Sequence, residues 1–238
     1  MKKKDLLANK SVEELKKDRD RLKKWRALLW GFVLFVLLVF ADQATKIAAD
    51  VYFSRRPEGY QVSLIPGWIY LEITYNRGIA YGSLGNSAEW LKIAVVVGTA
   101  LLMVLLSVFY IRMDTRRTFL RLAIILIVAG GVGNLIDRVQ YKIWETGDPR
   151  ILHGVRDMVN LERFGFAVCN FADFFITGGA VMLVLGFLFF DRDALFPTGK
   201  KYKALAWEQD NKKNELVEVK GTRLAEDYEP RTDETDNE

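Results

Sequence analysis

Hydrophobic residues along this 238-residue chain are gathered into four long blocks separated by polar segments. The blocks cover residues 27–51, 90–111, 118–139 and 171–190. A helix needs about 20 mostly apolar residues to cross roughly 30 Å of hydrocarbon, and each block comes close to that length. The pattern therefore predicts a mainly α membrane protein with four transmembrane helices.

The first block could be mistaken for a secretory signal peptide, because a basic segment precedes the apolar run at residues 27–41. That lead-in is longer than twenty residues, however, and no small-x-small cleavage pattern follows promptly. Asp42 and Lys46 also continue the helical pattern beyond the run. We therefore interpret this block as a retained first span.

A different periodicity occurs between the first two spans, where Trp68–Tyr75 reads WIYLEITY. Aliphatic residues alternate there with tyrosine, glutamate and threonine, which is typical of a β-strand. Pro66 and Gly67 come just before the strand and predict a turn. We expect a small extracytoplasmic β element on the outer face of the membrane, where its aromatic residues suit the interface.

The distribution of lysine and arginine predicts the orientation in the membrane. Eleven of them lie in residues 1–26, three lie in the short connection at residues 112–117, and more follow the last span. The longer connections, residues 52–89 and 140–170, are much sparser in basic residues. Both termini are therefore expected in the cytoplasm, with those two connections outside.

Three parts of the chain follow from these patterns. Residues 1–26 form a basic cytoplasmic segment, in which Ser11 and Glu14 have capping-box spacing at the start of a charged helix. Residues 27–190 form the four-span domain, and residues 191–238 form a charged cytoplasmic tail. The acidic end of the tail has almost no aliphatic side chains and is expected to be disordered.

Polar residues at membrane depth are costly and therefore indicate function. Asp42 and Lys46 share one helix face, which fits either a local ion pair near the interface or a role in holding a site. Asn134 and Arg138 share a stripe at the end of the third span, and they fit either helix packing or the bracing of carboxylates. After the strand, Asn76 offers donors and acceptors to a peptide.

Two acids lie near the outer ends of spans. Asp157 is in the second outer connection, and Asp173 follows Asn170 by three residues at the start of the last span. The second spacing is equally that of a helix cap, and Asp157 could face water. Two carboxylates that approach closely in a poorly solvated site share one proton, so that one can activate water while the other donates a proton. Spacing alone leaves these alternatives open.

Taken together, these residues resemble the lipoprotein signal peptidase family, also called signal peptidase II. The similarity covers most of residues 27–190 and consists of five motifs in order. They are Asp42-x-x-x-Lys46, Asn76-x-Gly78-x-Ala80, Gly131-x-Gly133-Asn134-x-x-Asp137-Arg138, Val155-x-Asp157 and Asn170-x-Ala172-Asp173. Each motif is weak alone, but five in order are highly specific.

The resemblance implies an aspartic endopeptidase of the bacterial inner membrane that uses no metal or cofactor. Its substrate would be a diacylglyceryl-modified prolipoprotein, cut just before the lipidated cysteine. Asp157 and Asp173 match the catalytic pair of the family. The substrate-binding or supporting positions are Asp42, Lys46, Asn76, Gly78, Asn134, Asp137, Arg138 and Asn170, with Asp137 assigned to bracing. Membrane lipid is the other expected partner, nucleic acid is not one because no binding motif accompanies the basic residues, and a monomer is expected.

Three positions depart from the usual pattern of the family. Tyr81 stands where phenylalanine is common, Met158 stands where phenylalanine is frequent, and Cys169 stands where an aromatic residue is usual. Both acids and their polar partners are intact. The departures therefore concern the shape of the pocket rather than the type of reaction.

Other functions fit parts of the sequence. A cysteine hydrolase could use Cys169 with His153, and a metalloprotease could use His153 with the two acids, although no H-E-x-x-H motif is present. A small transporter or proton-relay protein would use the ionisable residues of the spans. The chain shows no internal repeat, however, and its polar groups gather at one face instead of crossing the bilayer.

Overall fold

The computed structural model describes residues 12–76, 88–145 and 154–191, together with scattered positions between 194 and 211. The chain separates into two compact units, Met1–Val184 and Leu185–Glu238. All of the candidate site residues belong to the first unit. Ser11, with its expected capping role, and the acidic end of the tail lie outside the described residues.

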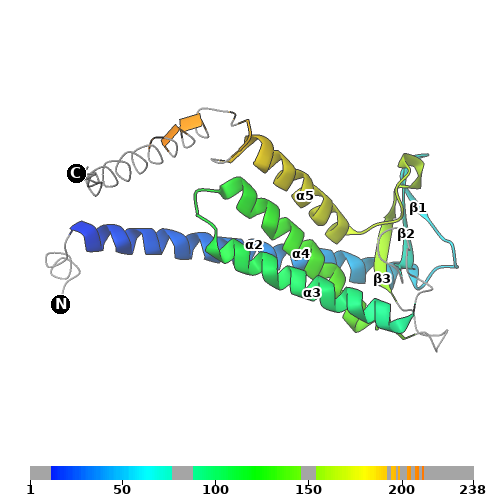
Figure 1. The fold of residues 1–238 in the computed structure, drawn as a ribbon. Coiled ribbons are helices and arrows are strands. Elements are labelled where there is room, and N and C mark those ends of the chain that lie inside the picture. Colours follow the sequence, from blue (N-terminus) through cyan, green and yellow to red (C-terminus); the bar gives the residue numbers. More distant parts are fainter. Residues whose placement is uncertain are drawn as a thin grey trace, which may run out of the picture. The chain divides into compact units, whose positions relative to one another are not determined.

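Within the described residues, four helices are long and apolar enough to cross a membrane, as the sequence predicts. They are α2 (Val12–Phe53), α3 (Glu89–Arg112), α4 (Thr118–Gln140) and α5 (Phe171–Phe189) (Figure 1). Their ends lie within two residues of the expected spans, except at the start of α2. That helix continues without a break through the basic segment that precedes residue 27.

Helix α4 is the central helix of the first unit. Of its most apolar stretch 56% is buried inside the protein, against 6% for α3 and 11% for α2. Side chains that remain exposed on the other helices are largely apolar, which is typical of a surface that faces lipid. Glycines on α4 allow a close approach by α5, because a Cβ atom added to Gly130 would lie 2.4 Å from the carbonyl oxygen of Ala172.

A three-stranded antiparallel sheet lies where α2 ends and where α3 and α5 begin (Figure 1). Its strands are β1 (Val62–Ile65), β2 (Ile69–Asn76) and β3 (Val155–Asn160), in that spatial order. The strand predicted from alternation is confirmed as β2. The turn predicted just before it is also present, with Gly67 at a φ of 79°.

Strands β1 and β3 were not predicted. Strand β3 contains the consecutive residues Arg156 and Asp157, which are both only 2% exposed. Two consecutive charged residues do not indicate a buried strand in a sequence. The short 3₁₀ helix η2 (Glu162–Phe164) follows, and the chain then returns to pair Cys169 with Val159. This pairing places the start of α5 beside β3.

In the second unit, three of the described residues after α5 bond to its last turn. The backbone amides of Leu195, Phe196 and Thr198 donate hydrogen bonds of 2.8–3.1 Å to the last three carbonyl groups of the helix. The last carbonyl groups of a helix have no partner within it, so these bonds satisfy them.

Candidate active site

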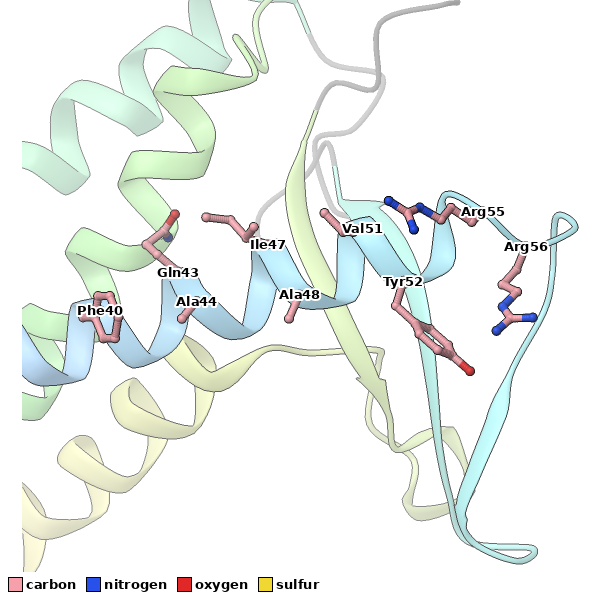
Figure 2. Close-up of a pocket in the computed structure, with 9 residues that line it drawn as sticks. All are labelled: Phe40, Gln43, Ala44, Ile47, Ala48, Val51, Tyr52, Arg55 and Arg56. Atoms are coloured by element: carbon pink, nitrogen blue, oxygen red, sulfur yellow. The ribbon is translucent and has the colours of Figure 1, made fainter.

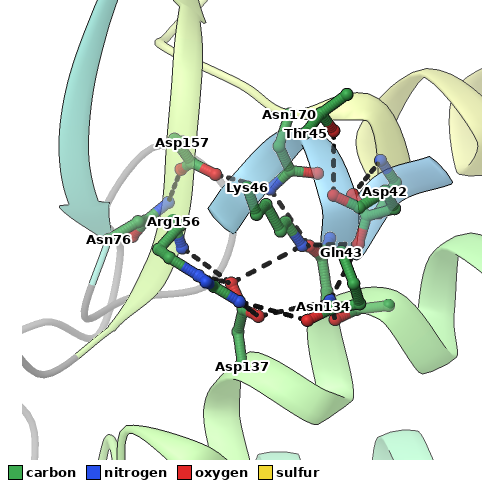
Figure 3. A network of polar contacts seen from close by, with 12 residues as sticks. Asp42, Gln43, Thr45, Lys46, Asn76, Asn134, Asp137, Arg156, Asp157 and Asn170 are labelled. Carbon is green, nitrogen blue, oxygen red and sulfur yellow. Dashed lines mark hydrogen bonds and ion pairs between the residues drawn. The ribbon is translucent and has the colours of Figure 1, made fainter. Parts of the chain in front are cut away.

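The two acids singled out in sequence lie on different elements, Asp157 on β3 and Asp173 in the first turn of α5. The side chain of Asn170 joins them. Its Nδ2 donates to Oδ1 of Asp157 at 2.6 Å, and its Oδ1 accepts from the backbone amide of Asp173 at 3.1 Å. Figure 3 shows the Asn170 and Asp157 side chains facing one another. One amide group therefore contacts the carboxylate of Asp157 at one end and the backbone of Asp173 at the other.

Asn170 and Asp173 also form the helix cap that their spacing allowed. Oδ2 of Asp173 accepts from the backbone amide of Asn170 at 3.0 Å, while Asn170 caps the amide of Asp173 in return. This reciprocal pattern is that of a capping box. The second oxygen, Oδ1 of Asp173, accepts from Nδ2 of Asn134 at 2.8 Å. One carboxylate thus belongs both to the cap and to the site, and the cap fixes the direction in which it points.

Asp157 is held in a poorly solvated setting. Its Oδ2 accepts from Nδ2 of Asn76, at the end of β2, at 3.1 Å. Burial, and next the charge of Asp173, raise the pKa of Asp157 to about 7, while the hydrogen bonds from Asn170 and Asn76 act in the opposite direction. An acid with this pKa holds a proton for much of the time near neutral pH.

Asn134 on α4 connects the acids to a buried cation. Its Oδ1 accepts from Nζ of Lys46 at 2.9 Å and from Nδ2 of Asn170 at 3.0 Å. An ammonium group has donors alone, so Lys46 must face the oxygen of the amide. That contact leaves the Nδ2 donor of Asn134 directed at Asp173.

Asp42 and Lys46 form an ion pair of 2.9 Å in which both side chains are fully buried. The pair is local, and it also joins helices. Oδ1 of Asp42 accepts from the backbone amide of Ala172 at 2.9 Å, and Nζ of Lys46 lies 3.6 Å from Oδ2 of Asp137. The two readings of this motif are compatible, because one pair is both an ion pair and a tie between α2, α4 and α5.

Two members of this network, Arg156 and Gln43, were not singled out in sequence. Nη2 of Arg156 donates to Oδ1 of Asp137 at 2.8 Å, and its backbone amide donates to Oδ2 of the same carboxylate at 2.9 Å. Gln43 accepts from Nη2 of Arg156 at 3.1 Å and donates to the carbonyl oxygen of Gly133 at 3.0 Å (Figure 3). Each lies next to a matched aspartate in the chain, and that adjacency was the available signal.

The guanidinium group of Arg138 is attracted by the charges of three acids. The attraction to Asp173 is the largest, followed by those to Asp157 and Asp137. Its Nε is buried and has no hydrogen-bond partner in the described part of the chain. A guanidinium in this position offsets the negative charge of the paired acids without binding either through Nε. Gly78 and Tyr81, which belong to the expected loop, lie outside the described residues.

Cys169 is half-buried beside the acids but is poorly suited to act as a nucleophile. Burial, and next the charges of Asp173 and Asp157, raise the pKa of its thiol to about 12. The thiolate is the reactive form, and this pKa keeps it scarce. The raised pKa of the thiol therefore argues against a cysteine hydrolase, and His153, the expected base, lies outside the described residues.

Together, the fold and the site define a multi-pass membrane protein in which two carboxylates are joined by asparagine side chains at one end of its helices. Aspartic peptidases likewise use two neighbouring carboxylates whose mutual repulsion raises the pKa of one of them, as the charge of Asp173 does here for Asp157. The class is therefore that of a membrane-embedded aspartic-type enzyme.

Comparison with known proteins identifies the family. The family model described as signal peptidase (SPase) II matches residues 34–189. A lipoprotein signal peptidase from Ectopseudomonas mendocina is 31% identical over 170 residues, which cover 68% of this chain and 89% of the relative. One from Pseudomonas putida is 34% identical over 168 residues, which cover 67% and 85%.

A solved structure agrees with this result. It is a bacterial membrane enzyme determined by the in meso method at 2.3 Å resolution, and it gives a TM-score of 0.53 at 26% identity. The similarity covers 66% of this chain and 85% of that chain. The chain belongs to the signal peptidase II family and is a bacterial multi-pass membrane peptidase of the aspartic type.

Proposed function

We propose that this protein removes the signal peptide from diacylglyceryl-modified prolipoproteins by cleaving just before the lipidated cysteine, with Asp157 and Asp173 as the catalytic pair. The observation that carries the proposal is the chain of hydrogen bonds that links the carboxylate of Asp157 to the carboxylate of Asp173 through Asn170 and Asn134, in a member of the signal peptidase II family. Both relatives described above bear the name lipoprotein signal peptidase.

The proposed chemistry needs one protonated and one ionised acid, and the raised pKa of Asp157 supports such a state. The ionised carboxylate takes a proton from water while the water oxygen attacks the scissile carbonyl carbon. The protonated acid gives its proton to the carbonyl oxygen, which forms a tetrahedral intermediate with two hydroxyl groups. As this intermediate collapses, the acid that took a proton from water gives it to the departing nitrogen, and the other carboxylate recovers a proton from one of the hydroxyl groups. The C–N bond breaks, leaving a carboxylate on the signal peptide and a free amino group on the cysteine. No covalent enzyme intermediate is required.

The supporting residues hold the two catalytic carboxylates in a fixed orientation. Asn134 and Asn170 use fixed amide groups to orient the two carboxylates, and Lys46 fixes the orientation of Asn134. Asn76 lies at the end of β2 against Asp157, where its amide can also bind the backbone of an extended substrate. Gly78, two residues later, would allow that backbone to approach closely.

The site would lie near the outer face of the membrane, with both termini in the cytoplasm. Basic residues gather before the first span, between α3 and α4, and after the last span, which supports this orientation. A signal peptide that spans the membrane would then present its cleavage point at the level of the sheet.

The direct test is cleavage of a lipid-modified prolipoprotein by the purified protein in detergent. Asp157→Asn and Asp173→Asn are each expected to lower the rate by at least about 10²-fold, because each removes a general acid or base. Asp20→Asn, at an exposed position of α2, is the matched control and should leave the rate unchanged. Full activity in either of the first two variants would refute the assignment.

A further inference from the structure

A groove of about 900 Å³ follows one face of α2 in the half of the helix nearest the sheet. The described part of its lining consists of nine residues between Phe40 and Arg56 (Figure 2). The seven from Phe40 to Tyr52 recur at intervals of three and four residues and form a single stripe along the helix, and the last two, Arg55 and Arg56, lie beyond its end. We call this feature the α2 groove. It lies on the surface of the helix, whereas Asp42 and Lys46 point into the buried network.

The shape and polarity of the α2 groove come from its side chains. Ala44 and Ala48 are one turn apart and leave the stripe shallow between the larger Phe40 and Tyr52. The exposed side chains along it are largely apolar, and Ile47 and Val51 are each about half exposed. A surface of this kind on a transmembrane helix is in contact with lipid chains.

The length of the apolar part matches one leaflet of a bilayer. Val51 is eleven positions after Phe40, and a helix rises 1.5 Å per residue, which gives about 16 Å. Half of a hydrocarbon core of roughly 30 Å is about 15 Å. An extended acyl chain that begins at the headgroup level near Val51 would therefore end near Phe40.

The mouth of the α2 groove is cationic. Arg55 and Arg56 lie in the turn after the helix, both are exposed, and neither forms an ion pair with any acid in the described ranges. The guanidinium of Arg56 lies 5.0 Å from the ring centre of Tyr52 and 5.5 Å from that of Tyr60, and these rings hold it at the level of the interface. Guanidinium groups bind phosphate through paired hydrogen bonds.

We propose that the α2 groove binds an anionic membrane phospholipid, with an acyl chain along Phe40–Val51 and its phosphate on Arg55 and Arg56. The diacylglyceryl group of a prolipoprotein would also offer acyl chains, but it carries no phosphate and would leave both arginines unused. Charge complementarity therefore favours the phospholipid. The inference does not rest on the proposed cleavage reaction.

The bound lipid lies next to the buried network without being part of it. Gln43 lines the α2 groove, and its side chain also contacts Asp137 and Arg156. A lipid chain in the groove therefore packs against the network from the bilayer side and keeps water from it.

Native mass spectrometry of the full-length protein in detergent tests the proposal by titration with phosphatidylglycerol and with phosphatidylcholine of the same chains. The wild type should retain phosphatidylglycerol preferentially. The double variant Arg55→Gln, Arg56→Gln should bind it about tenfold more weakly, because each basic side chain contributes to the attraction. Ala48→Trp, which fills the groove, should weaken the binding of both lipids.

Two matched controls separate this site from general lipid contact. Arg19→Gln, Arg21→Gln removes the same charge from exposed positions at the other end of α2, and Ala94→Trp adds the same bulk at an exposed position of α3. Both controls should bind as the wild type does. Equal retention of the two lipids by the wild type, or equal losses in the controls and the groove variants, would overturn the proposal. If Ala48→Trp raises the KM for prolipoprotein while the arginine variant keeps its lipid, the groove takes substrate chains instead.

Discussion

The carboxylate of Asp173 has two roles, one in the cap of helix α5 and one in the candidate active site. One of its oxygens completes the cap of α5 and the other accepts from Asn134, so the local rule for starting a helix also aims a reactive group. Asp157 differs, because it lies on a strand and its pKa is raised by burial and by the charge of Asp173. Predictions at the scale of the residue therefore concern the protonation of Asp157.

The rate of cleavage should depend on pH through Asp157. Its pKa is raised from 3.8 to about 7, so the acid is protonated below that pH and ionised above it. When one member of the pair must donate a proton, kcat/KM falls as the pH rises through about 7. Initial rates measured from pH 5 to 9 check this. A rate that stays constant between pH 6 and 8 would contradict it.

The same pKa shift predicts an effect on stability. Between about pH 4 and pH 7 the folded protein holds a proton on Asp157 that the unfolded chain releases, so the free energy of unfolding decreases as the pH rises across that range. Asp157→Asn removes the cost of a buried charge and should raise the unfolding temperature at pH 8, with little effect at pH 4. Thermal unfolding in detergent measures this, with Asp20→Asn as the control. A variant that is destabilised equally at both pH values would contradict the linkage.

At the scale of elements, α4 positions the others. Its glycines allow α5 to pack closely against it, and the carboxylate of its Asp137 binds β3 by accepting hydrogen bonds from Arg156. Each of these contacts joins segments that are distant in the chain. Substitutions at the contacts should therefore affect stability and activity together.

Gly130→Ala should destabilise the protein, because the new Cβ would lie 2.4 Å from a backbone oxygen of α5 that cannot move away without shifting the helix. Overpacking of this kind typically costs about 1–3 kcal/mol. Gly98→Ala on α3 is the control, since its Cβ would meet no atom within 4 Å and alanine favours a helix. Unfolding temperatures of the two variants provide the comparison. Equal temperatures would show that the α4–α5 contact adapts.

Arg156→Leu should release β3 from α4. The buried carboxylate of Asp137 would lose its guanidinium partner, and breaking a buried ion pair costs about 3–5 kcal/mol. Because Asp157 is the next residue along β3, kcat should fall as well. Arg163→Leu, at an exposed position of η2, is the control for stability and rate. Wild-type values for Arg156→Leu would show that the sheet is held by other contacts.

At the scale of the whole molecule, the four helices and the basic segments between them predict one orientation in the membrane. Helix α2 is long enough to continue well beyond the bilayer, since its 42 residues would extend over about 63 Å. Its charged amino-terminal part therefore projects from the membrane on the side opposite the sheet. The orientation can be tested with single cysteines.

In a Cys169→Ser background, Glu58→Cys should react with a membrane-impermeant maleimide in intact cells, because Glu58 is exposed in the turn before β1. Arg116→Cys, at an exposed position between α3 and α4, should react only after the cells are lysed. The reverse pattern of labelling would place the sheet and the site in the cytoplasm.

The spans and strand β2 could be predicted from sequence, because each depends on local composition, and the set of polar motifs was identified by its resemblance to the signal peptidase II family. About 20 apolar residues satisfy a bilayer wherever they occur, and alternation along WIYLEITY satisfies a strand with one apolar face. The Asn170 and Asp173 cap was equally visible, since capping depends on residues three apart. Sequence thereby determined which side chains could take part in a site.

Tertiary structure decided how those side chains meet. Strand β3 is buried because Asp137, nineteen residues away, neutralises Arg156, and no local pattern encodes such a partner. Asp157 reaches Asn170 because Cys169 pairs with Val159, which brings β3 to the start of α5. The raised pKa of Asp157 has the same origin, since burial and the neighbouring charge of Asp173 arise when distant segments pack together.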